Sequence, residues 1–275
     1  MTSASESLSP AFPCVLVYAV RERARAFVRV AFPRRRGRTL LVRTADEFQT
    51  AIRRELVDAA VIDLAGQGDD HWALAARAAD FPSTPFFGLL PFRTTDADAV
   101  ARSASLGFAD VLCEQIDESA ARDLVAPCGY SARFARALSD APDALGLRSD
   151  TQRRTWHAIV QHAGRPVTTT TLAATMGVTR EHLSRNFARD QGANLKRVID
   201  LVRLISAAEL SKNPGYDVRD VAAVLGFASS SHLAVTTQRI ASTRPASLSG
   251  LRAVDLIDRF VQGRTRSRVA GKGSL

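Results

Sequence analysis

A chain of 275 residues, 46% of them hydrophobic, is long enough for two ordinary domains that each bury a core. The formal net charge is +9, yet residues 1–150 carry 18 basic and 20 acidic side chains, whereas residues 151–275 carry 19 basic and 8 acidic ones. The basic excess therefore lies entirely in the second half. This is what one polyanion-binding domain beside an ordinary domain would show, with a generic basic surface as the alternative.

Several classes of protein are disfavoured by what the sequence lacks. The three cysteines have no CxxC or Cys/His spacing that could hold zinc or a redox pair. No apolar run approaches the roughly 18 residues of a membrane-spanning helix, and the N-terminus does not read as a signal peptide. The chain has no GxSxG, GxGxxG, GxxxxGK[ST] or HExxH motif. We therefore predict a cytoplasmic protein that is not an enzyme, has no catalytic residue, and needs no metal or cofactor.

The first half alternates between short apolar runs and segments with helical spacing. We expect residues 1–12 to be disordered and residues 13–138 to form one domain. Nearly continuous apolar strands separated by helices indicate a parallel sheet covered on both faces, so we predict an α/β flavodoxin-like fold. The predicted strands are Cys14–Val20, Thr39–Thr44, Ala59–Ala65, Phe86–Phe92 and Ala109–Glu114.

The alternation ends in a polar, turn-rich stretch over residues 139–150, which we predict to be a linker. Residues 151–262 then show helical patterns throughout, so we predict an all-α second domain. The last stretch, residues 263–275, is basic and contains Gly and Ser, and we expect it to be a tail without regular structure.

The all-α half contains a helix-turn-helix pattern. Leu172, Ala173 and Met176 form the inner face of one short helix, and Gly177 follows as its stop. Thr179 is placed to cap a second helix, in which Leu183 and Phe187 face inward. Two ordinary packed helices could give the same stripe, so this pattern alone does not settle the fold.

The pattern recurs further along the chain, and the recurrence strengthens the hypothesis. Ala222 and Gly226 repeat the small residue and the turn glycine, and Ser229 or Ser230 can cap the following helix. A long helix over residues 194–210 joins the two units, and at 1.5 Å per residue it spans roughly 25 Å. The two recognition helices could therefore reach successive major-groove segments, roughly 34 Å apart, on one face of DNA.

Over about one hundred residues the sequence resembles the DNA-binding domain of the AraC/XylS family of bacterial regulators. The landmarks that carry the resemblance are Leu172-Ala173, Gly177, Leu183-Ser184-Arg185, Phe187, Gly192, Arg203-Leu204, Ala207, Leu210, Val221-Ala222, Gly226-Phe227, Ser231-His232 and Pro245. The resemblance implies two helix-turn-helix units that enter adjacent major grooves, and a role in activating or repressing transcription. The implied partners are double-stranded promoter or operator DNA and RNA polymerase.

The residues expected to meet DNA lie in and next to the two recognition helices. They are Thr179, Arg180, Glu181, His182, Ser184, Arg185 and Arg189 in the first unit, and Ser229, Ser230, Ser231, His232, Thr236, Gln238 and Arg239 in the second. The second unit departs from the family pattern, with Thr237, Ala241 and Ser242 where an aromatic residue and a glycine are usual. Its recognition helix also has only one arginine. We therefore predict that the first unit dominates base reading.

The first half resembles the receiver domain of response regulators, chiefly in architecture. Asp63 ends the third strand, where a receiver would carry its phosphoacceptor. Phosphoryl transfer there needs Mg²⁺ held by several carboxylates, with a hydroxyl and a lysine nearby. Here Tyr18-Ala19-Val20 stand where an acidic pair is expected, Leu90 takes the hydroxyl position, and Glu114 takes the lysine position.

We therefore predict a pseudo-receiver that is not phosphorylated by the usual route and that acts through dimerisation, partner binding or ligand capture. The resemblance to receivers implies a homodimer through this domain. Two alternatives stay open: a response regulator switched by phosphorylation of Asp63, and a protein-binding adaptor in which DNA binding has weakened.

Overall fold

The computed structural model describes residues 13–33, 35, 37–66, 70–91, 93–189 and 193–272, so the predicted disordered residues 1–12 lie outside the described part. The chain forms two compact units. The α/β unit comprises Phe12–Arg133 together with a later segment, Lys212–Val224. The helical unit contains Phe134–Ser211 and Leu225–Leu275. The chain thus enters the α/β unit twice.

The α/β unit is built on one parallel five-stranded sheet with the strand order β2-β1-β3-β4-β5. Each predicted apolar run overlaps one of its strands, with ends that differ by at most two residues, so the predicted parallel α/β fold is confirmed. β1, β3 and β4 are buried along their whole length, which explains their unbroken apolar sequences. The strands are β1 Cys14–Tyr18, β2 Arg38–Val42, β3 Ala59–Asp63, β4 Phe86–Leu90 and β5 Asp110–Cys113.

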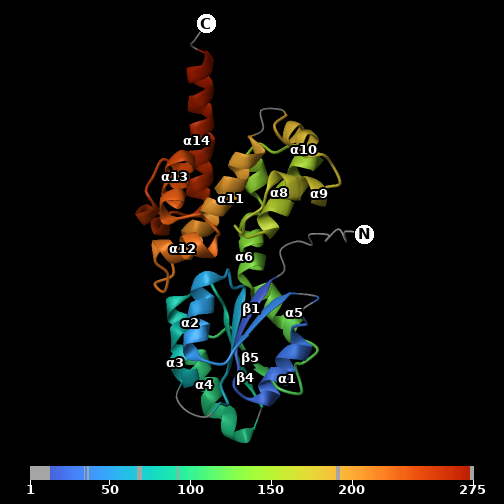
Figure 1. Ribbon diagram of the computed structural model, residues 1–275, viewed down its shortest axis with the longest axis vertical. Helices are drawn as coiled ribbons and strands as arrows, with labels where there is room; N and C mark the ends of the chain where they lie inside the picture. Colours follow the sequence, from blue (N-terminus) through green and yellow to red (C-terminus); the bar gives the residue numbers. More distant parts are fainter. Residues whose placement is uncertain are drawn as a thin grey trace, which may run out of the picture. The chain divides into compact units, whose positions relative to one another are not determined.

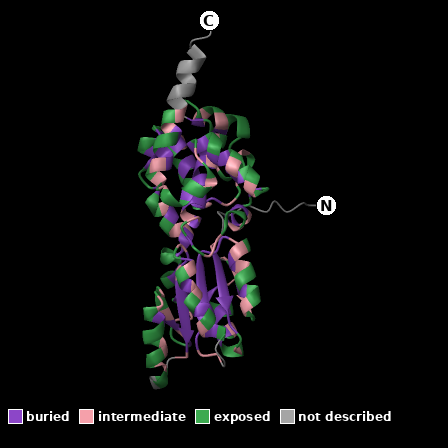
Figure 2. Cartoon of the chain, turned by 90° about the vertical axis from the view of Figure 1, so that its left-hand side faces the viewer, coloured by how far each residue is buried: buried purple, intermediate pink, exposed green. Residues whose placement is uncertain are grey.

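Helices cover both faces of this sheet (Figure 1). Phe27 and Val28 of α1 and Val125 of α5 pack on one face, whereas Phe48 of α2 and Leu74 of α3 pack on the other. Figure 2 shows the strands as the buried layer between half-exposed helices. The helices are α1 Glu22–Ala31, α2 Ala45–Arg54, α3 Asp70–Ala76, α4 Ala97–Ser105 and α5 Ala121–Val125, with α12 Val218–Val224 contributed by the later segment.

The helical unit surrounds α11, a helix of 16 residues in which 11 are buried. The predicted long connecting helix is therefore confirmed, and Asn194 caps its start by accepting a hydrogen bond from Lys196 N–H. No helix in the described ranges is long and apolar enough to cross a membrane. The helices from residue 130 onward, besides α12, are α6 Tyr130–Ala137, α7 Ala141–Ala144, α8 Asp150–Gln161, α9 Thr169–Thr175, α10 Arg180–Phe187, α11 Leu195–Leu210, α13 Ser230–Ala241 and α14 Ala253–Lys272.

The ends of the helical unit are more regular than the sequence suggested. The predicted linker over residues 139–150 contains the short helix α7 and the Ser149 cap of α8. The expectation of an irregular basic tail from residue 263 is wrong up to Lys272, because α14 continues through this stretch. Buried Leu256, Ile257 and Phe260 anchor the first part of α14.

Candidate nucleic-acid interface

The first helix-turn-helix unit consists of α9 and α10. Gly177 adopts φ +67° directly after α9, a left-handed conformation that ends helices and favours glycine. Thr179 then starts α10, and its hydroxyl accepts a hydrogen bond from the backbone N–H of His182 at 3.2 Å. The inward residues Leu183 and Phe187 are 1% and 0% exposed. The predicted turn, cap and buried stripe are therefore all present.

The opposite face of α10 is solvent-exposed and basic. Arg180, His182 and Arg185 are exposed on it, and Arg189 is exposed just after the helix ends. Arg180 forms an ion pair with Glu181 at 3.1 Å. A bond to its own backbone N–H and this arginine lower the pKa of Glu181, so the carboxylate stays ionised near neutral pH. The helix N-terminus thus presents both cationic and anionic groups to a ligand.

The remaining predicted residues of this unit have less exposed or more structural positions. Ser184 is half-buried, and Thr179 uses its hydroxyl as the helix cap. His182 lies 2.7 Å from Asn186, measured from Nε2 to Nδ2. Because the asparagine amide donates, His182 accepts at Nε2 in this arrangement. Its Nδ1 side is then the one that can donate to a ligand.

The C-terminal end of α10 is held by Gln152, a buried residue of α8 that the sequence reading did not single out. The Gln152 side-chain amide donates to the carbonyls of Phe187 and Arg189, at 3.0 and 3.2 Å. Its carbonyl accepts from the backbone N–H groups of Arg148 and Ser149. One side chain thus satisfies orphan groups at the start of α8 and the end of α10, and fixes the recognition helix relative to α8.

The second helix-turn-helix unit repeats the turn with a different setting. Gly226 adopts φ +65°, and Ser229 caps α13 by accepting a hydrogen bond from His232 N–H at 3.1 Å. Unlike the glycine of the first turn, Gly226 is also sterically confined, because an added Cβ would lie 2.5 Å from Cγ of Pro166. No side chain other than hydrogen fits this position.

Arg203 of α11 fixes the second turn from beneath. Its guanidinium donates twice to the carbonyl of Leu225, at 3.0 and 2.8 Å, and lies 3.8 Å above the ring of Phe227. Burial lowers the pKa of Arg203, with Asp200 opposing the shift. An arginine remains charged under these conditions, so the contact is a charge-assisted bond to the turn.

The outer face of α13 differs from that of α10. Ser231, His232, Gln238 and Arg239 are exposed, and Ser230 is half-buried. The expectation that Thr236 meets DNA is wrong, because it is 2% exposed. Thr236 lies three residues after the buried Leu233, so it shares the inward face of the helix. Arg239, the sole arginine of α13, forms an ion pair with Asp200 of α11 at 2.7 Å.

The C-terminal end of α13 contains the departures from the family pattern. Ser242 ends the helix at φ +52°, the left-handed region that favours glycine. Thr237 is fully buried and donates its hydroxyl hydrogen to the Leu233 carbonyl, four residues earlier. The polar side chain at position 237 is therefore satisfied within its own helix.

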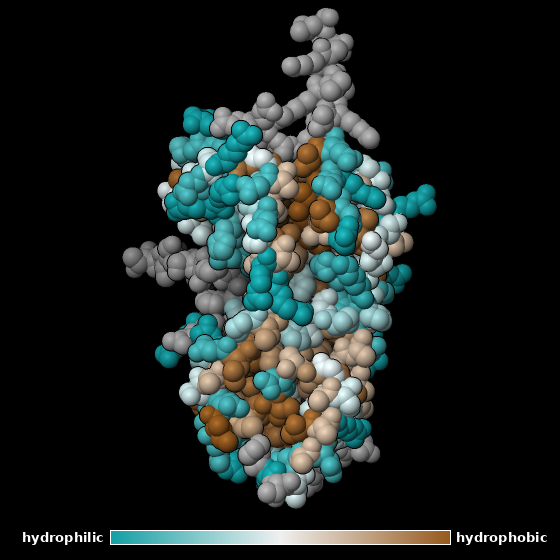
Figure 3. Space-filling view, turned by 180° about the vertical axis from the view of Figure 1, so that it is seen from behind, coloured by the Kyte–Doolittle hydropathy of each residue, from teal (hydrophilic) through white to brown (hydrophobic). Residues whose placement is uncertain are grey.

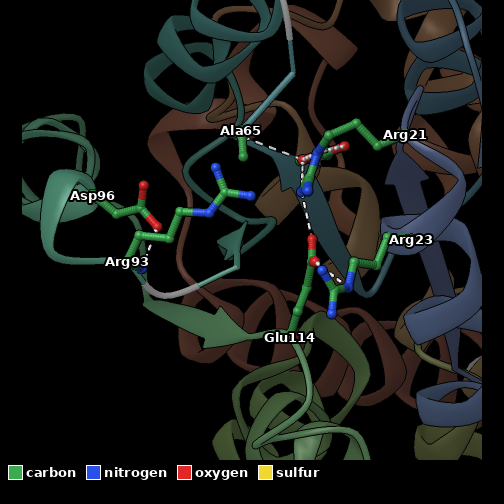
Figure 4. A network of polar contacts seen from close by, with 7 residues as sticks. Arg21, Arg23, Ala65, Arg93, Asp96 and Glu114 are labelled. Atoms are coloured by element: carbon green, nitrogen blue, oxygen red, sulfur yellow. Dashed lines mark hydrogen bonds and ion pairs between the residues drawn. The ribbon is translucent and has the colours of Figure 1, made fainter.

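The α/β unit carries a charged cluster at the carboxyl edge of its sheet (Figure 4). Asp63 ends β3 and Glu114 directly follows β5, and both side chains are 1% exposed. Arg21, just after β1, places its guanidinium between them. Its Nε lies 2.9 and 3.0 Å from the two oxygens of Asp63, and its Nη2 donates to Asp63 and to Glu114 Oε1.

This arrangement puts a built-in cation where a receiver would bind a metal ion. Burial lowers the pKa of Arg21, but its bonds to Asp63 and Glu114 outweigh this, so the pKa lies above its ordinary value. Asp63 also accepts a bond from Ala65 N–H at 3.2 Å. The other oxygen of Glu114 is buried without a hydrogen bond, 4.0 Å from Arg23 Nε. Arg21 thus occupies both oxygens of Asp63 and one oxygen of Glu114, which are the groups that could have held a metal ion.

A family profile described as "Helix-turn-helix domain" matches residues 172–249. Residues 172–249 are an AraC-type helix-turn-helix domain. The predicted resemblance to this family is confirmed for that part of the chain. The AraC-type helix-turn-helix domain indicates a DNA-binding transcription regulator.

The matching solved structures include two response regulators and full-length FixJ. A response regulator from Thermotoga maritima is 20% identical and covers 42% of this chain and 97% of its own, with a TM-score of 0.37. Full-length FixJ from B. japonicum is 14% identical over 72% of this chain and 97% of its own, with a TM-score of 0.38. A response regulator from Burkholderia pseudomallei is 16% identical over 64% of this chain and 99% of its own, with a TM-score of 0.36. No curated protein matches the chain.

In the AraC-type domain, most of the predicted contact residues lie at exposed positions on or next to α10 and α13, whereas Thr236 is buried. Sequence reasoning missed Arg21 and Gln152, because each acts on residues far away in the chain. A signal for Arg21 did exist. A glutamate at the lysine position of a receiver-like edge leaves two buried carboxylates together, which requires a cation from a neighbouring loop.

Proposed function

We propose that this protein is a sequence-specific, DNA-binding transcription regulator of the AraC type, whose receiver-like domain acts without phosphorylation. The observation that carries the first part is the exposed basic face of α10, on a helix fixed at both ends within an AraC-type domain. A helix presented this way fits the major groove, where arginine pairs with guanine in two parallel hydrogen bonds. Arg180 and Arg185 are the candidates for this reading.

DNA binding is tested by selecting duplexes from a random pool with the full chain. We expect a defined sequence to be enriched, with an affinity that falls steeply as salt rises, because phosphate contacts release counterions. Enrichment of no sequence, or equal binding to every duplex, would favour the alternative of a protein-binding adaptor.

The absence of phosphorylation is supported by the charged cluster at Asp63. Arg21 occupies both carboxylate oxygens of Asp63, and Glu114 would repel an added phosphoryl group. To bind here, a magnesium ion would have to displace Arg21 from Asp63. Only one of the carboxylates that hold Mg²⁺ in a receiver domain would then be present. Asp63 therefore serves as an ion-pair partner and not as a phosphoacceptor.

The test incubates the full chain with acetyl phosphate and Mg²⁺ and measures intact mass, with Asp63→Asn as the matched control. We expect no phosphoryl adduct on the wild-type chain and no change in DNA affinity. An adduct that Asp63→Asn abolishes would establish the alternative, a phosphorylation-switched regulator.

We also infer a homodimer through the α/β unit. Val100, Ile116 and Leu124 are large apolar side chains exposed on or near α4, β5 and α5. Figure 3 shows that hydrophobic surface is present on the face of this unit that it presents. Burying such a surface in a partner is favourable. Sedimentation of the wild-type chain and of Ile116→Lys tests this, with a monomeric wild type as the opposing result.

A cytoplasmic location and contact with RNA polymerase stay predictions from the sequence.

A further inference from the structure

One segment of the AraC-type domain belongs to the other compact unit. Residues Lys212–Val224, which contain the loop after α11 and the whole of α12, pack with the α/β unit. α12 is the first helix of the second helix-turn-helix unit. The corresponding helix of the first unit, α9, lies in the helical unit together with its partner α10. The two units of the DNA-binding domain therefore differ in what supports their first helix.

The segment is fastened at its start by backbone and amide hydrogen bonds. Asn213, 1% exposed, accepts from Ser83 N–H at 2.8 Å and donates to the Ser83 hydroxyl at 2.9 Å. The N–H of Gly215 donates to the carbonyl of Asp80 at 2.9 Å. These bonds satisfy polar groups of the loop that follows α3, as internal loops of a single domain do.

Next, the segment inserts an aromatic ring into the α/β unit. Tyr216 packs against the core cluster of α2, α3 and β4, and its ring meets Phe81 edge-on at 5.0 Å. Its hydroxyl donates to the carbonyl of Ile52 at 2.9 Å, and burial raises its pKa. Gly215 is confined beside it, because an added Cβ would lie 2.4 Å from the ring of Phe81.

α12 then contacts α2 near the C-terminal end of that helix. Asp220 of α12 faces Arg53 of α2, with the carboxylate 3.8 Å from the guanidinium. Val221 and Ala222 are 1% and 2% exposed. A buried amide with satisfied hydrogen bonds, a partly buried tyrosine and a glycine without room for a methyl group are features of packing within a single domain.

We propose that the α/β unit is a structural support of the second helix-turn-helix unit, binding Lys212–Val224 through the surface formed by α2, Phe81 and Ser83. The second recognition helix then reads its part of the operator only while this segment is held. This inference rests on the proposed DNA-binding function. It assigns to the receiver-like fold a role that needs neither phosphorylation nor a ligand.

The test uses the full chain and the duplex selected by the wild-type protein. Gly215→Val forces the segment off Phe81, and Tyr216→Phe removes only the bond to Ile52. Val28→Ala is the matched control, because Val28 is buried on the other face of the sheet. The part of the site read by α13 is identified with a Gln238→Ala/Arg239→Ala variant, and circular dichroism checks that each chain is folded.

We expect Gly215→Val to weaken binding by about tenfold, the effect of losing one or more base-pair contacts, with the loss confined to the part of the site read by α13. Tyr216→Phe should weaken it by about twofold to fivefold, in line with one hydrogen bond, and Val28→Ala should leave it unchanged. Tyr216→Phe decides the matter if Gly215→Val does not fold.

Three results would overturn the inference. Unchanged affinity in folded variants would make the segment a passive attachment, and tighter binding would make the contact inhibitory. Equal loss over the whole site would show general damage. If the wild-type chain selects no duplex, the proposed function itself fails. If the wild-type chain selects a site and the variants bind that site equally well, only the present inference fails.

Discussion

The two helix-turn-helix units share their local geometry and differ in their supports. Both turns hold a glycine in the left-handed region, at φ +67° and +65°, and both recognition helices start with a hydroxyl cap, from Thr179 and Ser229. In the first unit the helix end is bonded by Gln152. In the second unit the turn is bonded by Arg203, and the helix end is a strained serine, Ser242.

The two copies of the repeated motif present different groups to a ligand. The arginines of α10 lie on an exposed face, whereas the only arginine of α13 is already paired with Asp200. Reaching a base would require Arg239 to exchange this partner, which reduces the net gain from the contact. We therefore expect the first copy to read DNA more strongly than the second, which we expect to contribute weaker contacts.

The largest expected effect separates the two turns. Gly226→Ala should lower the free energy of unfolding by about 3 kcal/mol, because it combines a left-handed alanine with overlap against Pro166. Gly177→Ala has the same backbone strain but meets nothing within 4 Å, so we expect a loss of about 1 kcal/mol. Denaturant unfolding of both variants measures the difference, and equal losses would show that Pro166 imposes no constraint.

The next effect concerns DNA affinity. Arg185→Ala should weaken binding to the selected duplex by about tenfold to a hundredfold, as expected for loss of a base or phosphate contact on the exposed face of α10. Arg239→Ala should weaken it by about threefold or less, because its ion pair with Asp200 competes with DNA.

Titrations at one fixed salt concentration compare these two variants. Arg38→Ala serves as the control for losing one positive charge, because Arg38 pairs with Glu55 on the α/β unit. The reverse ranking of Arg185 and Arg239 would show that the second copy dominates.

A smaller effect is expected at the support of α10. Gln152→Leu replaces the buried amide by an apolar side chain of similar size and leaves the Phe187 carbonyl without its hydrogen-bond donor. We expect this to lower the free energy of unfolding by about 1.5 kcal/mol. Because the end of α10 is then less fixed, DNA affinity should fall as well. Gln161→Leu, on the exposed side of the same helix, is the control. A Gln152→Leu chain with wild-type stability would show that α8 does not hold the recognition helix.

The comparison also indicates which features the sequence could predict. The five strands and both turns follow from local patterns: apolar runs bounded by turn residues, and a glycine followed by a capping side chain. Thr236 was wrongly predicted to meet DNA, because helical spacing locates the inward face of a helix only to within about one residue, and a threonine hydroxyl suggests an exposed position.

The remaining features depend on pairs of residues far apart in the chain. Arg21 meets Asp63 and Glu114 at separations of 42 and 93 residues, and Asn213 meets Ser83 at a separation of 130. Two buried carboxylates at one edge of the sheet indicate that a cation lies nearby, but no periodicity or motif in one sequence says which residue supplies it or which residues pair at such separations. The division of the second helix-turn-helix unit between two compact units follows from these contacts, so the sequence predicted its residues but not its support.

The smallest expected effect is at the end of the second recognition helix. Ser242 holds φ +52°, a conformation that costs an L-residue about 1 kcal/mol or more. Replacing it by glycine removes this cost, but glycine loses more conformational freedom on folding, which offsets part of the gain. We therefore expect Ser242→Gly to raise the free energy of unfolding by about 0.5 kcal/mol. Ser242→Ala keeps the strain and should bring no gain, which makes it the matched control. If thermal unfolding shows no difference between the two variants, the left-handed conformation of Ser242 imposes no strain that glycine can relieve, and the weaker reading that we expect of the second copy would rest on the pairing of Arg239 with Asp200 alone.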